Sequence, residues 1–215
     1  MTPDEVLREF DVSRETSVRL EALVALLTRW NAGINLVAPA TIDTVWTRHI
    51  ADSAQLFDLA PAPASTWIDL GSGAGFPGLV IAALAAEKQP GLHVTLVESD
   101  TRKAAFLATA AREMSLEVTI EASRIEALAA RPHDVVSARA LAPLDRLCAL
   151  AHRFSARQTG RQMGSGTVFL FLKGARLDSE LTAATAHWHI RAERIASRTD
   201  PEATVLRILE LEPRT

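Results

Sequence analysis

The stretch WIDLGSGAGFPG, residues 67–78, decides the fold predicted for this chain of 215 residues. An apolar run that contains Asp69 leads into a segment with four glycines in eight positions. Glycines let the backbone turn sharply and approach a ligand without an intervening side chain. Pro77 suits the first turn of a helix. The stretch therefore predicts a strand, a tight loop able to approach a ligand, and a helix.

Short apolar runs alternate with stretches of helical length from Thr66 onward. Strands that are buried on both faces read as continuous apolar runs, and their alternation with helices implies right-handed crossovers into a parallel sheet. The pattern predicts an α/β, Rossmann-like fold with a mostly parallel, doubly wound sheet. The predicted strands are 66–70, 93–99, 117–123, 134–139 and 167–173, and the predicted helices are 77–87, 101–114, 124–130, 143–153 and 176–186.

The two ends of the chain differ from this pattern. The strand-like runs 189–198 and 204–211 are separated by five residues, a connection that suits an antiparallel hairpin. Before Thr66 the pattern is helical, with a capping-box sequence at Thr2 and Glu5, apolar residues at helical spacing over 20–30, and a second helical stretch over 41–59. We expect a helical extension at 1–62, packed on a Rossmann-like α/β domain at 63–215.

Composition excludes several classes of protein. The net charge is −3 and the sequence pI is near 6.1, so a nucleic-acid site would have to be a local patch. No apolar run approaches the ~20 residues of a membrane span, and the first residues lack the apolar centre of a signal peptide. The single cysteine, Cys148, and six scattered histidines predict neither a disulfide framework nor a metal site. We expect a soluble, cytoplasmic protein without a membrane partner.

The spacing of the glycines indicates which ligand the loop binds. A dinucleotide fingerprint requires glycine at its first, third and sixth positions, and the sixth position counted from Gly71 is Phe76. The pattern present is instead D-x-G-x-G-x-G, formed by Asp69, Gly71, Gly73 and Gly75. This pattern resembles the first motif of S-adenosylmethionine-dependent methyltransferases. A dinucleotide-dependent oxidoreductase is correspondingly disfavoured.

Two acidic residues strengthen the cofactor interpretation. Glu98 ends the second predicted strand, at the place where a carboxylate reaches the ribose hydroxyls in nucleotide-binding α/β folds. Alone, it would be read as a solvated residue. Asp69 could merely cap the turn, but beside the glycines we expect it to support the methionine end of the cofactor.

Seven motifs in order resemble the bacterial small-subunit ribosomal RNA guanine-N7 methyltransferases, the RsmG or GidB family. The resemblance runs from Trp30 to Gly174 and covers both the helical and the α/β parts of the chain. A small-molecule methyltransferase, the alternative, would share the glycine loop but would not need the first two motifs. The motifs are WNAGINLV (30–37), RHIADS (48–53), DLGSGAGFPG (69–78), VESDTRKAAFL (97–107), SRIE (123–126), SARALAPL (137–144) and LKG (172–174).

The resemblance implies transfer of a methyl group from S-adenosylmethionine to N7 of one guanine in 16S ribosomal RNA. It also implies a set of cofactor contacts, in which Ile125 would cover the adenine or act through its backbone. Packing is the alternative for Phe76, and ordinary exposure is the alternative for Glu126. The implied cofactor residues are Gly71, Gly73, Phe76, Glu98, Ile125, Glu126 and Arg139.

The predicted chemistry needs few catalytic groups. Guanine N7 has an in-plane lone pair and no proton to remove, so positioning supplies much of the rate and no general base or covalent nucleophile is required. Cys148 lies in an apolar helical run and is interpreted as a core residue. The chain reads SARALAPL at the place where amine methyltransferases usually have an Asn-Pro-Pro-aromatic motif.

Arg139 is the predicted catalytic residue beyond the cofactor loop. It ends a strand beside the expected methyl site, where a guanidinium could meet the cofactor carboxylate, a phosphate or guanine O6. The alternative is a surface ion pair with Asp145 or another acid. For RNA binding we single out Arg48, His49 and Lys173, with Arg157 and Arg161 as further candidates. His49 could equally pack between helices. The expected partner is 16S RNA, free or in the small subunit, bound by a monomer.

Overall fold

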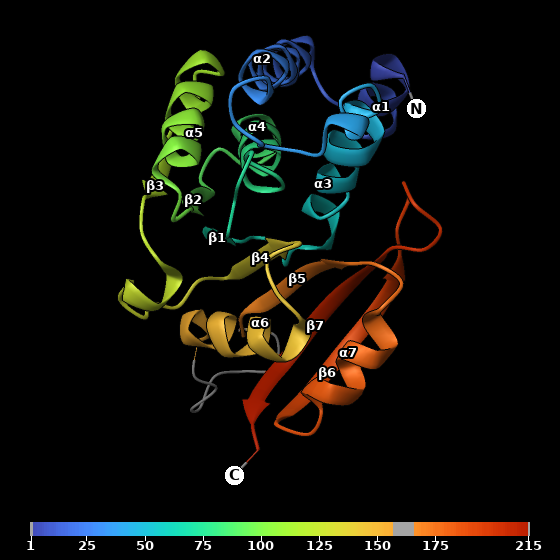
Figure 1. Ribbon diagram of the computed structural model, residues 1–215, viewed down its shortest axis with the longest axis vertical. Helices are drawn as coiled ribbons and strands as arrows, with labels where there is room; N and C mark the ends of the chain where they lie inside the picture. Colours follow the sequence, from blue (N-terminus) through green and yellow to red (C-terminus); the bar gives the residue numbers. More distant parts are fainter. Residues whose placement is uncertain (1, 157–165, 215) are drawn as a thin grey trace.

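The computed structural model describes residues 2–156 and 166–214, and its central feature is one mixed β-sheet (Figure 1). Five strands run parallel: β1 (Thr66–Leu70), β2 (His93–Val97), β3 (Val118–Glu121), β4 (Val135–Arg139) and β5 (Val168–Lys173). Two more, β6 (Trp188–Ala196) and β7 (Thr204–Pro213), form an antiparallel hairpin. The strand order is β3-β2-β1-β4-β5-β7-β6, with β7 antiparallel to β5. The predicted fold class and strands are confirmed.

Helices cover both faces of the sheet (Figure 1). On one face lie α4 (Gly78–Lys88) and α5 (Thr101–Glu113), with the N-terminal helices α1 (Pro3–Glu9) and α2 (Arg14–Asn31) packed outside them. On the other face lie α6 (Leu144–Ala151), its 3-10 continuation η5 (His152–Phe154) and α7 (Leu177–Ala184). The carboxyl ends of the parallel strands meet at one edge of this layered core, where ligands of open α/β sheets bind.

The N-terminal helices are joined to the sheet layers by apolar contacts and by hydrogen bonds from Ser13 and Thr16 to Glu87 of α4. One hydrophobic cluster includes Leu23 of α2 together with Trp67 of β1 and Phe106 of α5. The predicted capping box is present, because the Thr2 hydroxyl accepts from Glu5 N and the Glu5 carboxylate accepts from Thr2 N. No helix within the described residues is long and apolar enough to cross a membrane.

The segment predicted as one helix over 41–59 is irregular instead. It contains η1 (Pro39–Thr41), a π-helix, η2 (Trp46–Ala51), α3 (Asp52–Ala54) and η3 (Phe57–Leu59). Two side chains donate hydrogen bonds to backbone carbonyl oxygens of this segment. Ser53 Oγ donates to His49 O at 2.6 Å, and Arg139 Nη1 donates to Arg48 O at 3.0 Å. Such bonds compete with regular helical bonds, and π-turns of this kind occur often at functional sites.

The helix predicted over 124–130 is also wrong, because only a 3-10 turn, η4 (Ile125–Ala127), forms there. The guanidinium of Arg153 donates to the carbonyl oxygens of Glu126 and Leu128 at 2.8 and 2.9 Å. Those two carbonyls are thereby partly satisfied without helical bonds. Pro132 follows closely and lacks the amide N–H that a longer helix would need.

Candidate functional site

The glycine loop leaves the carboxyl end of β1 and turns directly into α4. Gly71, Gly73 and Gly75 have positive φ angles of 68°, 54° and 85°. A side chain at Gly71 would meet Leu141, since a Cβ built there lies 2.6 Å from Leu141 Cδ1. A Cβ at Gly73 would lie in open space, with only Gly71 O at 3.8 Å. The backbone at Gly73 is therefore open to a ligand.

Asp69 lies beneath the loop and is fully buried. Its Oδ1 accepts from Ser137 Oγ at 2.7 Å and its Oδ2 accepts from Gly78 N at 3.1 Å. Burial raises the pKa of Asp69 to about 6 in spite of these hydrogen bonds. The carboxylate thus fixes the start of α4 to β4 and acts on any ligand through the loop that it holds.

Glu98 joins the loop to the end of β2. The residue is 8% exposed, its Oε2 accepts from Gly73 N at 2.9 Å, and its Oε1 accepts from Asp100 N at 2.8 Å. Each carboxylate oxygen has a second lone pair, so both can still accept from a ligand hydroxyl. The open backbone of Gly73 and a carboxylate bonded to it fit the ribose end of S-adenosylmethionine.

The two predicted residues after β3 differ in their surroundings. Ile125 is 8% exposed and belongs to the core cluster on the α6 face. The Glu126 side chain is half exposed and forms an ion pair with Arg146. Their turn follows β3, which pairs with β2, so both residues lie at the same edge of the sheet as Glu98.

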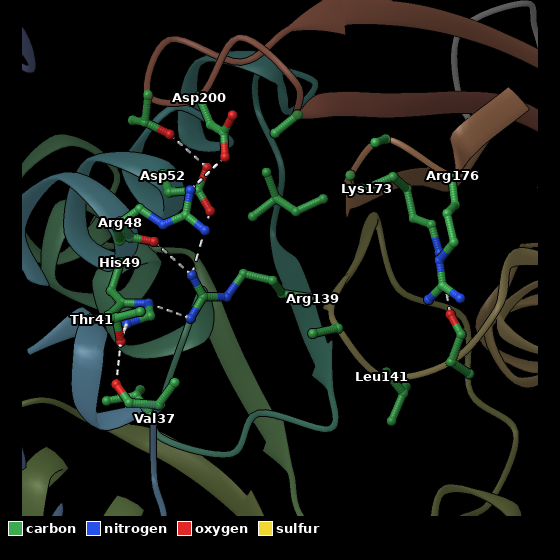
Figure 2. A pocket seen from close by; sticks show the side chains of 18 of the residues that line it. Val37, Thr41, Arg48, His49, Asp52, Arg139, Leu141, Lys173, Arg176 and Asp200 are labelled. Atoms are coloured by element: carbon green, nitrogen blue, oxygen red, sulfur yellow. Dashed lines mark hydrogen bonds and ion pairs between the residues drawn. The ribbon is translucent and has the colours of Figure 1, made fainter. Parts of the chain in front are cut away.

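Arg139 ends β4 and turns toward the N-terminal segment (Figure 2). Its Nη1 donates to Arg48 O at 3.0 Å and to Asp52 Oδ2 at 3.4 Å, and its Nη2 lies 2.8 Å from His49 Nδ1. Arg139 thus pairs with an acid, as its alternative interpretation allowed, but the acid is Asp52 rather than Asp145 and the pair is largely buried. Among the described residues, one Nη2 hydrogen and the Nε–H of Arg139 have no partner. These two donors are available to a ligand.

His49 is a packed, neutral residue next to Arg139. Its ring stacks on Phe76 with centroids 5.0 Å apart, and the guanidinium carbon of Arg139 lies 5.2 Å from the centre of the same Phe76 ring. Phe76 is 3% exposed, so its side chain packs here and only its backbone can meet a ligand. Burial, followed by the charges of Arg139 and Arg48, lowers the pKa of His49 to about 3.

The hydrogen bonds of His49 fix its tautomer. A guanidinium can only donate, so Nδ1 of His49 accepts from Arg139 and the ring proton is on Nε2. Nε2 then donates to Thr41 Oγ1 at 2.8 Å, and Thr41 Oγ1 donates to Ala38 O at 2.7 Å. The chain of bonds orients Arg139 from the N-terminal segment, a role that is distinct from the RNA contact predicted for His49.

An open pocket of about 880 Å³ begins beside Arg139 (Figure 2). Its lining includes Arg48, His49, Arg139 and Lys173, the four residues singled out above for catalysis and RNA binding. It does not place the glycine loop, Glu98, Ile125 or Glu126 there, and the Leu141 side chain lies over Gly71 between loop and pocket. Apart from Arg139, which was predicted for both roles and lines the pocket, the cofactor and RNA candidates therefore occupy adjacent but separate parts of the sheet edge.

Lys173 and Arg48 are both engaged within the protein. Lys173 is 10% exposed, forms an ion pair with Glu180 and donates to Ala142 O at 3.2 Å. Arg48 forms an ion pair with Asp200 in the β6–β7 turn. Sequence reasoning missed Asp52, Glu180 and Asp200, although Asp52 stands in the RHIADS motif. Arg157 and Arg161 lie outside the described residues, and the described part of the chain has no cluster of three metal-ligating side chains.

Comparisons with known proteins identify the family and the fold. Residues 17–202 match the family described as rRNA small subunit methyltransferase G. The ribosomal RNA small subunit methyltransferase G of Jannaschia sp. is 53% identical over 196 residues, which cover 91% of this chain and 89% of that protein. The protein of the same name from Cereibacter sphaeroides is 45% identical over 98% of both chains. A solved variant of MtNAS in complex with S-adenosylmethionine has the same fold, with a TM-score of 0.56 at 12% identity over 97% of this chain and 83% of that one.

Proposed function

This chain belongs to the rRNA small subunit methyltransferase G family, and on that premise we propose that it methylates N7 of one guanine in 16S ribosomal RNA. The structural observation that carries the proposal is the open backbone at Gly73, which is bonded to Glu98 and lies at the edge of the sheet beside the pocket of Arg139. One edge thus offers a cofactor site and an adjoining space for an acceptor.

We propose that S-adenosylmethionine binds along the carboxyl ends of β1, β2 and β3. Gly71, Gly73, Gly75 and the Phe76 backbone would contact it, Glu98 would accept from its ribose hydroxyls, Ile125 and Glu126 would border its base, and Asp69 would hold the loop. The cofactor supplies a sulfonium methyl group that an in-line lone pair can displace. This chain orients both reactants, and such positioning lowers the barrier of a reaction between two bound groups.

The protein groups around the pocket suit an acceptor that needs no deprotonation. His49 is neutral and both its ring nitrogens are already bonded. Cys148 is buried on the α6 face, and burial raises the pKa of its thiol to about 12, which makes it a poor nucleophile. Arg139 has donors left for guanine O6 or a phosphate. Guanine N7 has a free lone pair, so it is an acceptor that these side chains can orient without a base or a nucleophile.

The remaining parts of the chain have supporting roles in the proposal. Residues 1–62 act as a helical extension of the catalytic domain at 63–215, and the extension supplies Arg48 and His49 to the acceptor side. The substrate is 16S RNA, free or within the small subunit, and the enzyme acts on it in the cytoplasm as a monomer. Arg48, His49 and Lys173 border the RNA site and shape it through their internal bonds.

The experiment that tests this function is methyl transfer from radiolabelled S-adenosylmethionine to small ribosomal subunits that lack the native modification, with protein-free 16S RNA as a second acceptor. Borohydride and aniline treatment then cleaves the RNA at N7-methylguanine. We expect one cleavage site in 16S RNA, and no label with a Gly73→Asp variant. Binding of S-adenosylmethionine without label in either RNA would refute the proposal in favour of a small-molecule methyltransferase.

A further inference from the structure

Charged side chains line the pocket in pairs, with one exception. Among the described residues that line it, three acidic side chains each pair with one basic side chain, and the guanidinium of Arg176 pairs with no acid. The lining therefore carries one uncompensated positive charge. The three pairs are Arg48–Asp200, Arg139–Asp52 and Lys173–Glu180.

Arg176 is exposed and stands immediately before α7. In Figure 2 it lies with Lys173 on the side of the pocket opposite Arg139 and His49. A Cβ built at Gly174 would meet nothing within 4 Å, so the chain next to Arg176 is open to the pocket. The Lys173–Glu180 pair holds this wall to the loop after β4, because Lys173 Nζ donates to Ala142 O and Glu180 accepts from Leu144 N.

Between Arg139 and Arg176 the pocket is lined mostly by apolar side chains. They include Ala140, Leu141, Ala142, Pro143 and Ala175. The volume of about 880 Å³ lies within the range of pockets that hold drug-sized molecules. Apolar walls suit the faces of an unstacked base, and the phosphate of a base held there would remain at the polar rim.

We propose that Arg176 binds a backbone phosphate of the substrate RNA next to the target guanine, while the base enters the pocket toward Arg139. The inference rests on the proposed function and adds a residue outside the seven motifs to the RNA site. A guanidinium binds phosphate through two parallel N–H donors. Arg176 can do so without competing with an internal ion pair, whereas Arg48, Arg139 and Lys173 are each already paired with an acid.

The test measures RNA binding rather than activity. Wild type, Arg176→Ala, Arg176→Lys and the control Arg131→Ala are titrated with unmodified small subunits and with free 16S RNA at 50–200 mM KCl. Arg131 is a suitable control because it is also exposed but precedes the amino end of β4, at the opposite edge of the sheet. Calorimetry with S-adenosylmethionine verifies that each variant keeps an intact cofactor site.

One lost phosphate contact lowers the slope of log K against log salt by about 0.7 for single-stranded RNA, which is about fivefold in affinity at 0.1 M salt. We expect this loss for Arg176→Ala, wild-type behaviour for Arg131→Ala, and affinity within about twofold of wild type for Arg176→Lys, which retains the charge. Equal affinities and slopes for Arg176→Ala and Arg131→Ala would overturn the inference, as would Arg176→Lys losing as much as Arg176→Ala. Wild type that binds neither RNA would overturn the proposed function itself.

Discussion

Replacing Asp69 by asparagine should remove a pH dependence from the stability of this protein. Asp69 is fully buried and its pKa rises from the ordinary 3.8 to about 6 because burial disfavours the charged carboxylate. Between these two pH values the native state keeps a proton that the unfolded state has released. The free energy of unfolding therefore falls as pH rises through this window, and it stays lower at pH 7.

The pKa difference sets the size of the effect. Proton linkage gives a loss of about 2.5 kcal/mol from Asp69 between pH 4 and pH 7.5, within a full difference of about 3 kcal/mol. The Asp69→Asn variant lacks this ionisation. Its amide oxygen can still accept from Ser137 Oγ, but its NH₂ group faces the amide N–H of Gly78, which costs about 1–3 kcal/mol at every pH. Only the difference between wild type and variant isolates the ionisation from other titrating groups.

The assay is urea unfolding of both proteins at pH 4, 5, 6 and 7.5, followed by tryptophan fluorescence, since Trp67 is fully buried. The stability of wild type relative to Asp69→Asn should fall by about 2.5 kcal/mol across the series. A Ser137→Ala variant loses the donor to Oδ1, which raises the native pKa of Asp69 further and should extend this fall to higher pH. A relative stability that is constant within about 0.5 kcal/mol would refute the reasoning, because the native pKa would then equal the unfolded one.

Three further predictions concern the site itself. Gly73→Asp should abolish cofactor binding in calorimetry and leave the fold intact, because its side chain enters open space and aspartate tolerates positive φ. Gly78→Ala should instead prevent folding, because its Cβ would collide with Leu96 and Asp69. Normal cofactor affinity in Gly73→Asp would contradict the predicted role of the loop. Arg139→Ala should lower kcat/KM about 100-fold, the equivalent of one or two charged hydrogen bonds. His49→Phe keeps the stacking on Phe76 but loses the acceptor for Arg139, and it should lower kcat/KM about tenfold. Losses of activity that only follow the melting temperature would assign both residues to stability. Cys148→Ser should leave methyl transfer intact and cost about 1–3 kcal/mol of stability for a buried hydroxyl, and a covalent RNA adduct at Cys148 would contradict direct displacement.

The sequence was sufficient to predict the sheet because its signals are local. Most runs from 66–70 to 167–173 are short and apolar, and the five residues between 198 and 204 suit a hairpin far better than a parallel crossover. The helices predicted at 41–59 and 124–130 failed for one shared reason. In each case an arginine distant in sequence, Arg139 or Arg153, donates to backbone carbonyls of the segment. Helical periodicity contains no information about such a donor.

The candidate site divides in the same way. The glycine pattern and Glu98 could be predicted because chain order alone brings them to the carboxyl edge. The pairing of Arg139 with Asp52 and His49 could not, because those residues lie about 90 positions away and meet only in the folded chain. Lys173 reads as a free cation in sequence, yet Glu180, on the next helix, neutralises it. Arg176 had no motif to mark it.

The residues that form the pocket are synthesised at different times during translation. Arg48 and Asp200, which form an ion pair at its rim, are 152 residues apart. At about 5–20 residues per second, a ribosome needs roughly 8–30 seconds to add the second after the first. The glycine loop, Glu98 and Arg139 are synthesised within that interval, before the turn at 197–203 that closes the rim. The acceptor side of the pocket is therefore the last part of the site to be completed during synthesis.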